Sequence, residues 1–362
     1  MSLSSRDPLE STTEPPGPAR EAIEKALKHE GFENFGFAEL TTPVSIDLYE
    51  DWLKKGYQGE MAYLSRHLPE KREPQKLLAK ARMAIVVTQN YVPHPQPIEK
   101  WPLTDSTKVA SYARGRDYHH FLVEKLRRVI ASLKEIYPGE EFRSFTDSSP
   151  VLERDLAKKA GLGWIGKNTC LLNRTTGSLF LIAEIYTTMF LPIAHLESPD
   201  HCGTCTRCLD ACPTGALVNP RELDARKCIS YLTIESRELP PVDLRKQMGD
   251  WFFGCDICQN VCPWNIKFHG TEKLTPKSGG PQSDADLTQD LRWIMTSSNR
   301  ALEKAFIGTP LTRAGGFGLK RNALVVAANR GLRELTIEIT KIKDDPKLSE
   351  LAEWALRTLQ ES

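Results

Sequence analysis

Eight of the nine cysteines lie in one short stretch of the chain, between residues 200 and 265. Four of them form a C-x2-C-x2-C-x3-C-P motif and are Cys202, Cys205, Cys208 and Cys212. In bacterial ferredoxins this spacing lets three thiolates hold one iron–sulfur cube while the fourth reaches a second cube. Zinc sites instead present separated C-x2-C pairs, so the spacing favours iron–sulfur clusters over zinc.

The remaining cysteines complete a second set of ligands. By the crossed ligation of two-cluster ferredoxins, one [4Fe–4S] cluster is predicted to bind Cys202, Cys205, Cys208 and Cys262. The other is predicted to bind Cys212, Cys228, Cys255 and Cys258. Two such clusters carry single low-potential electrons from an external donor. The ninth cysteine, Cys170, lies in an apolar pattern and is predicted to be a buried, inert thiol.

Helices and strands alternate before the cysteine-rich stretch. Apolar periodicity predicts helices over residues 117–137 and 151–160 and one beginning near Ala19. Predicted strands cover residues 34–40, 83–92 and 141–146, and a β-hairpin is predicted from residues 170–172 and 178–187. This alternation predicts an α/β or α+β domain over residues 19–195.

The rest of the chain divides by composition. Residues 1–18 are rich in Ser, Thr, Pro and Glu and are predicted to be a disordered tail. Residues 196–270 form the predicted iron–sulfur domain, and a polar linker follows. Residues 285–362 are predicted to be helical, with stacked helix pairs similar to a HEAT-like segment, although one or two pairs do not establish a repeat.

Overall charge and hydropathy exclude several classes of protein. Lys+Arg number 48 and Asp+Glu 47 among 362 residues, for a net charge of +1. This balance excludes a histone-like or polybasic protein whose whole surface binds nucleic acid. No apolar run approaches the roughly 20 residues that a membrane span needs, and the first residues lack the apolar core of a secretory signal. We therefore expect a soluble, cytoplasmic protein, and a monomer.

Several segments together resemble the epoxyqueuosine reductase family. They are GRDYH at residues 115–119, TDSSPVLER at 146–154, AGLGWIGKN at 160–168, and the cysteine motif continuing to TGAL at 214–217. The likeness runs in order from about residue 19 to residue 265. It implies a cobalamin-dependent reductase that removes the epoxide oxygen of epoxyqueuosine at the tRNA wobble position, the last step of queuosine synthesis.

The resemblance also implies a fold and a mode of cofactor binding. The catalytic domain of the family is similar to that of reductive dehalogenases and has a nitroreductase-like core. The sequence has no D-x-H-x-x-G cobalamin motif, since the stretch at Asp117 lacks the glycine. That absence suits the family, which binds cobalamin without a protein histidine on the cobalt.

Asp147 matches the family's proton donor, so we assign it as the general acid. To hold a proton near neutral pH its pKa would have to be raised, which burial against an apolar corrin could do. The alternative is that Asp147 caps the helix predicted to begin at Val151.

Cobalamin contacts are also implied by the resemblance. The turn at Gly166, Lys167 and Asn168 is predicted to approach the corrin, and its glycines do not form a dinucleotide fingerprint because they follow a helix and precede a strand. The other matching positions are Arg72, Ala110, Leu171, Ile182, Ser230 and Asp256. The alternatives are a plain turn, a solvated arginine and ordinary core residues.

Basic side chains near these motifs are candidate tRNA contacts. Arg154 and Lys158 share one helix face. Arg221 lies in a second basic group, and a third is formed by Lys320 and Arg321. Phosphates need such groups, although each alone is more often a solvated helix face. A single modified base must enter a pocket, which favours an unpaired nucleotide of the anticodon loop.

Two other functions remain open from the sequence. One is a reductive dehalogenase-like enzyme for a small molecule, but such enzymes usually carry an export signal. The other is an electron carrier in which a ferredoxin module is joined to helical repeats. A carrier does not need the α/β domain that bears Asp147, which favours the reductase.

Overall fold

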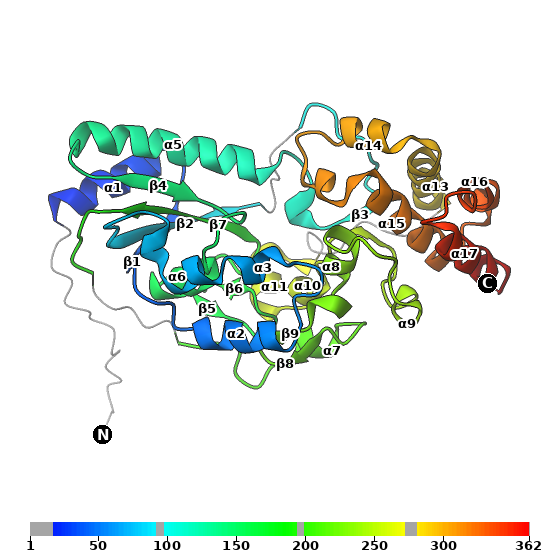
Figure 1. Cartoon of the computed structure of the whole chain (residues 1–362), viewed down its shortest axis with the longest axis horizontal. Coiled ribbons are helices and arrows are strands. Elements are labelled where there is room, and N and C mark those ends of the chain that lie inside the picture. The colour runs from blue at the N-terminus through cyan, green and yellow to red at the C-terminus, as the bar shows by residue number, and fades with distance from the viewer. Residues whose placement is uncertain (1–16, 92–97, 194–198, 272–280, 362) are drawn as a thin grey trace, which may run out of the picture.

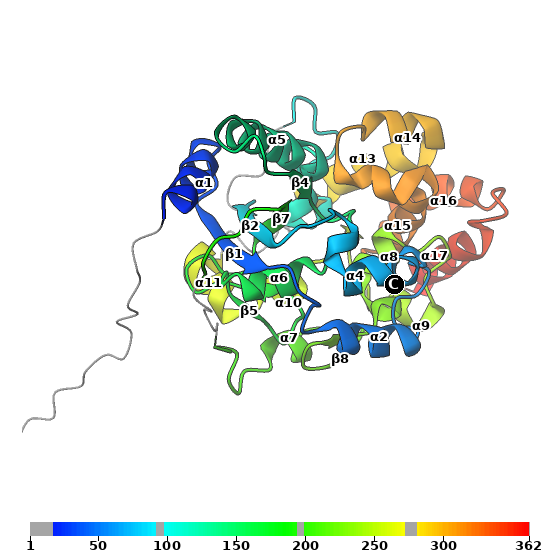
Figure 2. The same ribbon diagram turned by 60° about the vertical axis from the view of Figure 1, so that its left-hand side comes forward.

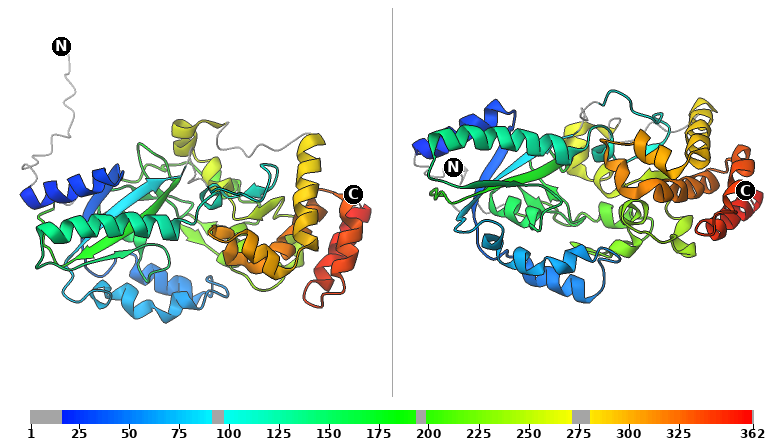
Figure 3. Two further views of the ribbon diagram at one scale, coloured as in Figure 1. Left: turned by 90° about the horizontal axis from the view of Figure 1, so that it is seen from above. Right: turned by 45° about the horizontal axis from the view of Figure 1, so that its top comes forward.

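The computed structural model describes residues 17–91, 98–193, 199–271 and 281–361. The chain forms three lobes in a row, with an α/β lobe at the N-terminal end, a cysteine-rich middle lobe and a helical lobe at the C-terminal end (Figure 1). The view from above shows the same order (Figure 3). Most of the predicted tail and of the polar linker lies outside the described residues.

The α/β lobe is built on a four-stranded antiparallel sheet. In sheet order the strands are β1 (Asn34–Glu39), β2 (Met83–Asn90), β7 (Phe180–Thr187) and β4 (Phe142–Phe145). The first six residues of β2 are all buried, because helices cover both faces of the sheet. The predicted strands are confirmed, each shorter by one or two residues.

Two long helices cover one face of the sheet and a short helix covers the other. Helices α1 (Pro18–His29) and α5 (Tyr118–Ile136) bury Ile23, Leu27, Leu122 and Leu126 against the first face. Helix α6 (Glu153–Lys159) packs on the opposite face (Figure 2). The chain at the end of α6 passes so close that a Cβ on Gly36 would lie 2.2 Å from the Ala160 carbonyl oxygen, so β1 needs a glycine there.

The segment between β1 and β2 joins the first lobe to the second. It contains α2 (Ile46–Lys54), α3 (Tyr63–Arg66), α4 (Leu68–Arg72) and η1 (Pro74–Lys76). The Trp52 indole donates to the Leu223 carbonyl at 2.6 Å, and the Glu60 amide donates to the Tyr231 hydroxyl at 2.8 Å. These contacts fix the segment against the cysteine-rich lobe.

The predicted hairpin is wrong in its pairing. Strand β6 (Leu171–Leu172) pairs with β5 (Trp164–Ile165), and only an isolated bridge between Asn173 and Gly177 connects it with the following turn. Strand β7 does not return along β6, because both of its edges already pair with β2 and β4.

The cysteine-rich lobe consists of short elements. They are α7 (Arg207–Asp210), β8 (Leu217–Asn219), β9 (Glu222–Leu223), η3 (Ala225–Lys227), α8 (Ile229–Ile234), α9 (Val242–Arg245), β10 (Trp251–Phe253), α10 (Ile257–Asn260) and α11 (Pro263–His269). Strand β10 pairs in parallel with β3 (Lys108–Val109), which η2 (Ser111–Ala113) follows. A segment that the sequence places in the first domain thus packs against the other two lobes.

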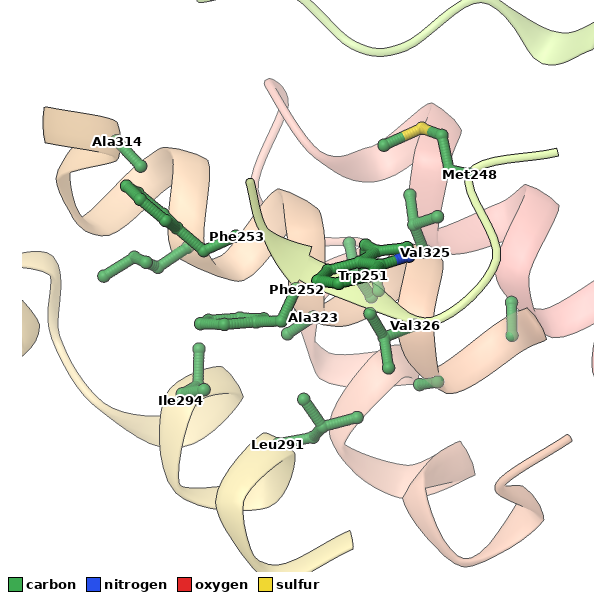
Figure 4. Close-up of a cluster of buried hydrophobic side chains, with 14 of the residues drawn as sticks. Met248, Trp251, Phe252, Phe253, Leu291, Ile294, Ala314, Ala323, Val325 and Val326 are labelled. Atoms are coloured by element: carbon green, nitrogen blue, oxygen red, sulfur yellow. The ribbon is translucent and has the colours of Figure 1, made fainter. Parts of the chain in front are cut away.

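The C-terminal lobe is helical, as predicted. Its elements are α13 (Pro281–Thr296), α14 (Asn299–Ala305), η4 (Pro310–Ala314), α15 (Gly315–Asn329), η5 (Arg333–Leu335), α16 (Thr336–Ile342) and α17 (Ser349–Glu361). Figure 4 shows Trp251 and Phe252 of β10 packed with Val325 and Val326 of α15, so one core joins the last two lobes. Within the described ranges, no helix is long and apolar enough to cross a membrane.

Candidate active site and iron–sulfur centres

Asp147 lies on the loop after β4, with a backbone φ of 38°. Its Oδ2 accepts hydrogen bonds from the Tyr118 hydroxyl at 2.7 Å and lies 3.0 Å from Nε2 of His119. Asp147 does not cap α6: the N-cap position is Leu152, which makes no side-chain bond. The capping alternative is therefore wrong, and the carboxylate instead faces the start of α5.

Asp147 and His119 form an ion pair. Burial by itself would raise the pKa of Asp147, but hydrogen bonds from His119 and Tyr118 outweigh it and hold the pKa below its usual value. Partial burial opposes a charge on His119, yet the bonds to Asp117 and Asp147 raise its pKa to about 9. The Asp147 side chain is 56% exposed here, and the proton of the pair lies on His119 at neutral pH. The raised pKa expected from burial of Asp147 against a corrin stays a prediction.

A second layer of ionisable groups surrounds the Asp147 loop. The side chain of Glu153 accepts the Asp147 amide, and burial together with the Asp147 charge raises the pKa of Glu153 to about 8. Glu184 of β7 is fully buried, and burial raises its pKa well above the usual value. Neither of its oxygens has a hydrogen-bond partner in the described ranges. Burial lowers the pKa of nearby Lys71.

The C-terminal lobe also contributes to this site. The Arg313 guanidinium lies 5.6 Å from the Tyr63 ring centroid and makes two hydrogen bonds, of 2.9 and 2.8 Å, to Glu235. Its charge helps to lower the pKa of Asp147. The site therefore lies where the three lobes meet, which the sequence did not predict.

Four of the cysteines surround a cavity of about 280 Å³. They are Cys202, Cys205, Cys208 and Cys262. These are the residues predicted to share one cluster by crossed ligation. In the part of the chain that the structure describes, no three ligand side chains converge on a single-ion site. A tetrahedral zinc ion would hold its thiolates at about 2.3 Å, so a cavity of this size suits a larger group.

The second predicted set also lies together. Burial raises the pKa of the Cys228 thiol, and the nearby Cys212 raises it further. Burial likewise raises the pKa of the Cys255 thiol, with contributions from Cys228 and Cys212. Cys258 shares a hydrogen bond with Cys170, which is only partly buried. The predicted full burial of Cys170 is wrong, because its side chain lies beside the second cysteine set at the start of β6. That the thiol is inert stays a prediction.

The turn at residues 166–168 contacts the iron–sulfur loops. The Lys167 ammonium donates to the carbonyls of Gly203 at 2.7 Å and Cys205 at 3.0 Å. The Asn168 amide donates to the Cys258 carbonyl at 3.4 Å. Gly166 is buried, and a Cβ there would lie 2.5 Å from the Leu172 side chain. Lys167 is thus engaged by backbone carbonyls, contrary to the prediction that it reaches a corrin.

Three predicted cofactor residues lie near the second cysteine set. Asp256 is 3% exposed, and its Oδ2 accepts the amide and hydroxyl of Ser111 at 2.7 and 2.8 Å. Its Oδ1 has no partner in the described ranges. Ala110 is buried, and its amide donates to the Phe253 carbonyl at 2.8 Å. Ser230, in α8, is partly buried. An unpartnered carboxylate oxygen suits the amide-bearing side chains of a corrin.

The other predicted cofactor residues lie elsewhere. Arg72 is ion-paired with Glu50 at a partly exposed position. Leu171 and Ile182 pack in the apolar core between the sheet and α6. The structure does not bring these three side chains to Asp256.

The basic candidates include exposed side chains and buried ones. Arg154 and Lys158 are exposed on α6, although Arg154 also donates to the Thr169 carbonyl at 2.6 Å. Arg221 is partly exposed, paired with Asp200 and bonded to the Ile165 carbonyl at 2.9 Å.

In the third basic group, Lys320 is partly buried and Arg321 is fully buried. The Arg321 guanidinium bonds to the carbonyls of Leu232 and Glu238 at 2.6 and 3.1 Å. The prediction that Arg321 contacts tRNA is wrong, because its donors hold the backbone of the middle lobe.

Sequence reasoning missed the partners of Asp147. Tyr118 and His119 lie in the GRDYH segment that carried the resemblance, but the sequence analysis assigned neither side chain a role. Asp117 does cap α5 by accepting the His119 amide. Nothing in the local pattern indicated Glu184 or Arg313.

Comparison with known proteins identifies two family matches. Residues 71–148 match the family "Epoxyqueuosine reductase QueG, DUF1730". Residues 201–265 match the family "4Fe-4S double cluster binding domain". The two matches cover the Asp147 loop and both cysteine sets.

Whole-chain comparisons agree. The epoxyqueuosine reductase of Cyclobacterium marinum is 40% identical over 303 residues, covering 83% of this chain and 94% of that protein. The epoxyqueuosine reductase of Pseudomonas aeruginosa is 36% identical, covering 97% and 98%.

A solved epoxyqueuosine reductase of Streptococcus thermophilus covers 94% of this chain and 90% of its own, with a TM-score of 0.77 and 27% identity. A crystal structure of an epoxyqueuosine reductase with an epoxyqueuosine-modified tRNA stem loop matches with a TM-score of 0.75 and 30% identity, covering 94% and 89%. Sequence and structure therefore place this chain in the epoxyqueuosine reductase family.

Proposed function

We propose that this chain reduces epoxyqueuosine to queuosine at the wobble position of tRNA. The observation that carries the proposal is the Asp147 carboxylate, held by His119 and Tyr118 where the three lobes meet. This acid–base group lies in the same chain as two sets of four cysteines. An electron carrier has no use for such a group, so the alternative of a ferredoxin-type carrier is disfavoured.

The reaction needs both electrons and protons. Converting an epoxide to an alkene takes up two electrons and two protons and releases the oxygen as water. Asp147 is the proposed group that delivers a proton to the leaving oxygen, and His119 is the proposed source of that proton, because its pKa is about 9. A Bacillus subtilis epoxyqueuosine reductase structure has its catalytic aspartate loop swung out of the active site. We propose that the loop of Asp147 is its counterpart.

Cobalamin and two [4Fe–4S] clusters are the cofactors of this family. When bound, cobalamin would supply the low-valent cobalt that reduces the epoxide carbon. Asp256, Ala110 and Ser230 are the proposed residues that hold it, and the unpartnered Oδ1 of Asp256 supports this. Arg72, Gly166, Asn168, Leu171 and Ile182 remain proposed contacts from the family resemblance alone.

The positions of the two cysteine sets relative to Asp147 suggest the order in which they carry electrons. Asp256 bonds to Ser111, and the ring of the next residue, Tyr112, lies 6.1 Å from the Tyr118 ring. The Tyr118 hydroxyl in turn donates to Asp147, so a short series of contacts connects the two carboxylates. Asp256 follows Cys255 directly. We propose that an external donor reduces the Cys202 set first, and that the Cys255 set then passes electrons to the active site.

Exposed basic residues are the proposed tRNA contacts. Arg154, Lys158 and Arg221 remain candidates, as does the partly buried Lys320, and Arg313 joins them because it lies at the active site. Phosphate contacts position the nucleic acid, and an unpaired anticodon-loop base can be splayed out into a pocket. The solved relative with a tRNA stem loop supports this substrate.

The finer architecture is part of the same proposal. We assign a nitroreductase-like cobalamin domain to residues 19–195, a ferredoxin-like domain to 196–270 and a HEAT-like domain to 285–362. Strand β3 is the exception, since it pairs with β10 of the second domain. A monomer in the cytoplasm is proposed as well.

Anaerobic turnover tests the proposal directly. The purified protein, reconstituted with iron, sulfide and cobalamin, is given a strong reductant and an anticodon stem loop carrying epoxyqueuosine. Conversion to queuosine, read by mass spectrometry of the digested RNA, is expected. Conversion of a halogenated phenol without conversion of the stem loop would instead favour a small-molecule reductase.

A further inference from the structure

The indole of Trp164 points at one of the predicted cluster ligands. Its Nε1 donates a hydrogen bond to Sγ of Cys202, with a distance of 3.4 Å. Trp164 is 2% exposed and lies in β5 of the α/β lobe, whereas Cys202 lies in the iron–sulfur lobe. One lobe therefore supplies a hydrogen bond to a cluster ligand in the other.

The surroundings of this contact are aromatic. The Trp164 ring makes edge contacts with Trp264 and His201, with ring centroids 5.2 and 4.9 Å apart. Trp264 and His201 line the 280 Å³ cavity together with Cys202. The buried Nε2 of His201 has no partner within the described ranges, as expected where a group with acceptor atoms belongs.

The same turn holds the backbone around that ligand. Three residues after Trp164, the Lys167 ammonium donates to the carbonyls of Gly203 and Cys205. The donor indole and the loop that carries the acceptor sulfur are thus tied together at fixed separation. Such fixing makes the indole–sulfur contact a stable feature of the folded protein.

We propose that Trp164 sets the reduction potential of the cluster bound by Cys202, Cys205, Cys208 and Cys262. Reduction adds negative charge to a cluster, and an N–H directed at a ligand sulfur stabilises the reduced form, which raises the potential. Trp164 is a positioning residue here and takes no part in bond breaking. The proposal rests on the family's double-cluster assignment, and not on the proposed tRNA reaction.

Trp164→Phe is the informative variant, and Trp52→Phe is its matched control. Phenylalanine keeps an aromatic ring in each place but removes the N–H. The Trp52 indole donates to the Leu223 carbonyl at 2.6 Å and lies outside the cavity lining, so its loss should leave the cluster potential unchanged. Both variants are prepared as full chains with both clusters reconstituted, and iron content confirms loading.

Potentiometric titration followed by electron paramagnetic resonance gives the readout. In Trp164→Phe, one of the two cluster midpoint potentials is expected to shift to a more negative value while the other stays constant. In Trp52→Phe neither is expected to move. No shift in Trp164→Phe, equal shifts in the two variants, or a shift of both clusters would overturn the proposal.

A second measurement begins with the wild-type protein. Reconstitution of the wild-type protein in D2O replaces the indole proton by deuterium, and Fe–S(Cys) stretching bands in resonance Raman spectra respond to a deuteron bonded to the ligand sulfur. A small band shift in D2O is expected, and because the backbone N–H groups bonded to Cys262 also exchange, the shift should be smaller in Trp164→Phe than in the wild type. Identical spectra in H2O and D2O would overturn the proposal even if Trp164→Phe failed to fold. Neither measurement involves tRNA or cobalamin, so failure of the proposed reaction would leave this result interpretable.

Discussion

Nε2 of His119 lies 3.0 Å from Oδ2 of Asp147, and Nδ1 of the same ring lies 2.7 Å from Oδ1 of Asp117. The imidazole therefore bridges two carboxylates, one at each nitrogen, which requires a proton on both nitrogens for two full hydrogen bonds. The bridge fixes the ring and stores a proton next to Asp147. This arrangement explains why a carboxylate with a lowered pKa can still belong to a protonating site.

Loss of the proton from His119 should lower the turnover rate at alkaline pH. The pKa of His119 is about 9, so the ring is charged below pH 9 and becomes neutral as the pH rises through that value. We expect His119→Gln to lower kcat about 100-fold, within the range of general acid catalysis. We also expect the wild-type kcat to fall above pH 9. Stopped assays of stem-loop conversion across pH 6–10 measure both effects.

The neighbouring exposed residue provides the control. His120 is the next residue of α5 and is exposed. His120→Gln should retain wild-type kcat and the same alkaline limit. If both variants lost activity equally, the bridge would not be the proton source.

The raised pKa of buried Glu184 predicts that this side chain makes the folded protein less stable as the pH rises. Because burial raises its folded-state pKa, the unfolded chain releases this proton at a lower pH than the folded protein does. Wild-type stability should therefore decline as the pH rises above the ordinary Glu pKa of about 4.3. Glu184→Gln cannot ionise, so its Tm should exceed that of the wild type by a few degrees at pH 8 and by less at pH 4.

Thermal unfolding followed by circular dichroism at both pH values tests this. Glu21→Gln, at an exposed position of α1, is the control and should show no pH-dependent gain. A gain for Glu184→Gln that is the same at pH 4 and pH 8 would refute the assigned ionisation.

Substitution of Arg321 should destabilise the protein, whereas substitution of the adjacent Lys320 should not. Arg321→Ala leaves buried carbonyls of the middle lobe without donors, and each such group costs about 1–3 kcal/mol, so a loss of about 3 kcal/mol in unfolding free energy is expected. Lys320→Ala should change stability by less than about 0.5 kcal/mol. Denaturant titration distinguishes them, and equal stability of the two variants would contradict the buried role.

The cysteine sets predict iron content. Cys262→Ser removes one ligand of the first cluster, so bound iron should fall from about eight atoms per chain towards about four. Cys170→Ser removes the cysteine that lies beside Cys258 but belongs to neither predicted set, and it should keep the full content. Iron analysis after anaerobic reconstitution measures both. Loss of iron in Cys170→Ser alone would require a different ligand assignment.

The parts predicted well from the sequence are those encoded locally. The spacing of the cysteines contains the ligand geometry, and Cys262 indeed lines the same cavity as Cys202. Apolar periodicity predicted a helix over residues 117–137, and α5 covers Tyr118–Ile136 with Leu122 and Leu126 fully buried. In these cases neighbours in sequence determine the structure.

The parts that failed depend on contacts between distant segments. Asp147 finds His119 28 residues away, and only the folded sheet and α5 bring them together. Lys167 looked free to reach a cofactor, but the carbonyls that bind it lie 36 and 38 residues further along the chain. Arg321 resembled a surface charge because its carbonyl partners lie more than 80 residues earlier.

The most direct test of the account compares wild-type protein with Asp147→Asn under single-turnover conditions. Asparagine keeps the size of the side chain but cannot deliver the proton. With both clusters loaded and cobalamin bound, the variant should take up cobalamin to the same extent as wild type and convert the epoxyqueuosine stem loop at least 100-fold more slowly. Conversion by Asp147→Asn at the wild-type rate would contradict the account and remove Asp147 from the protonation step.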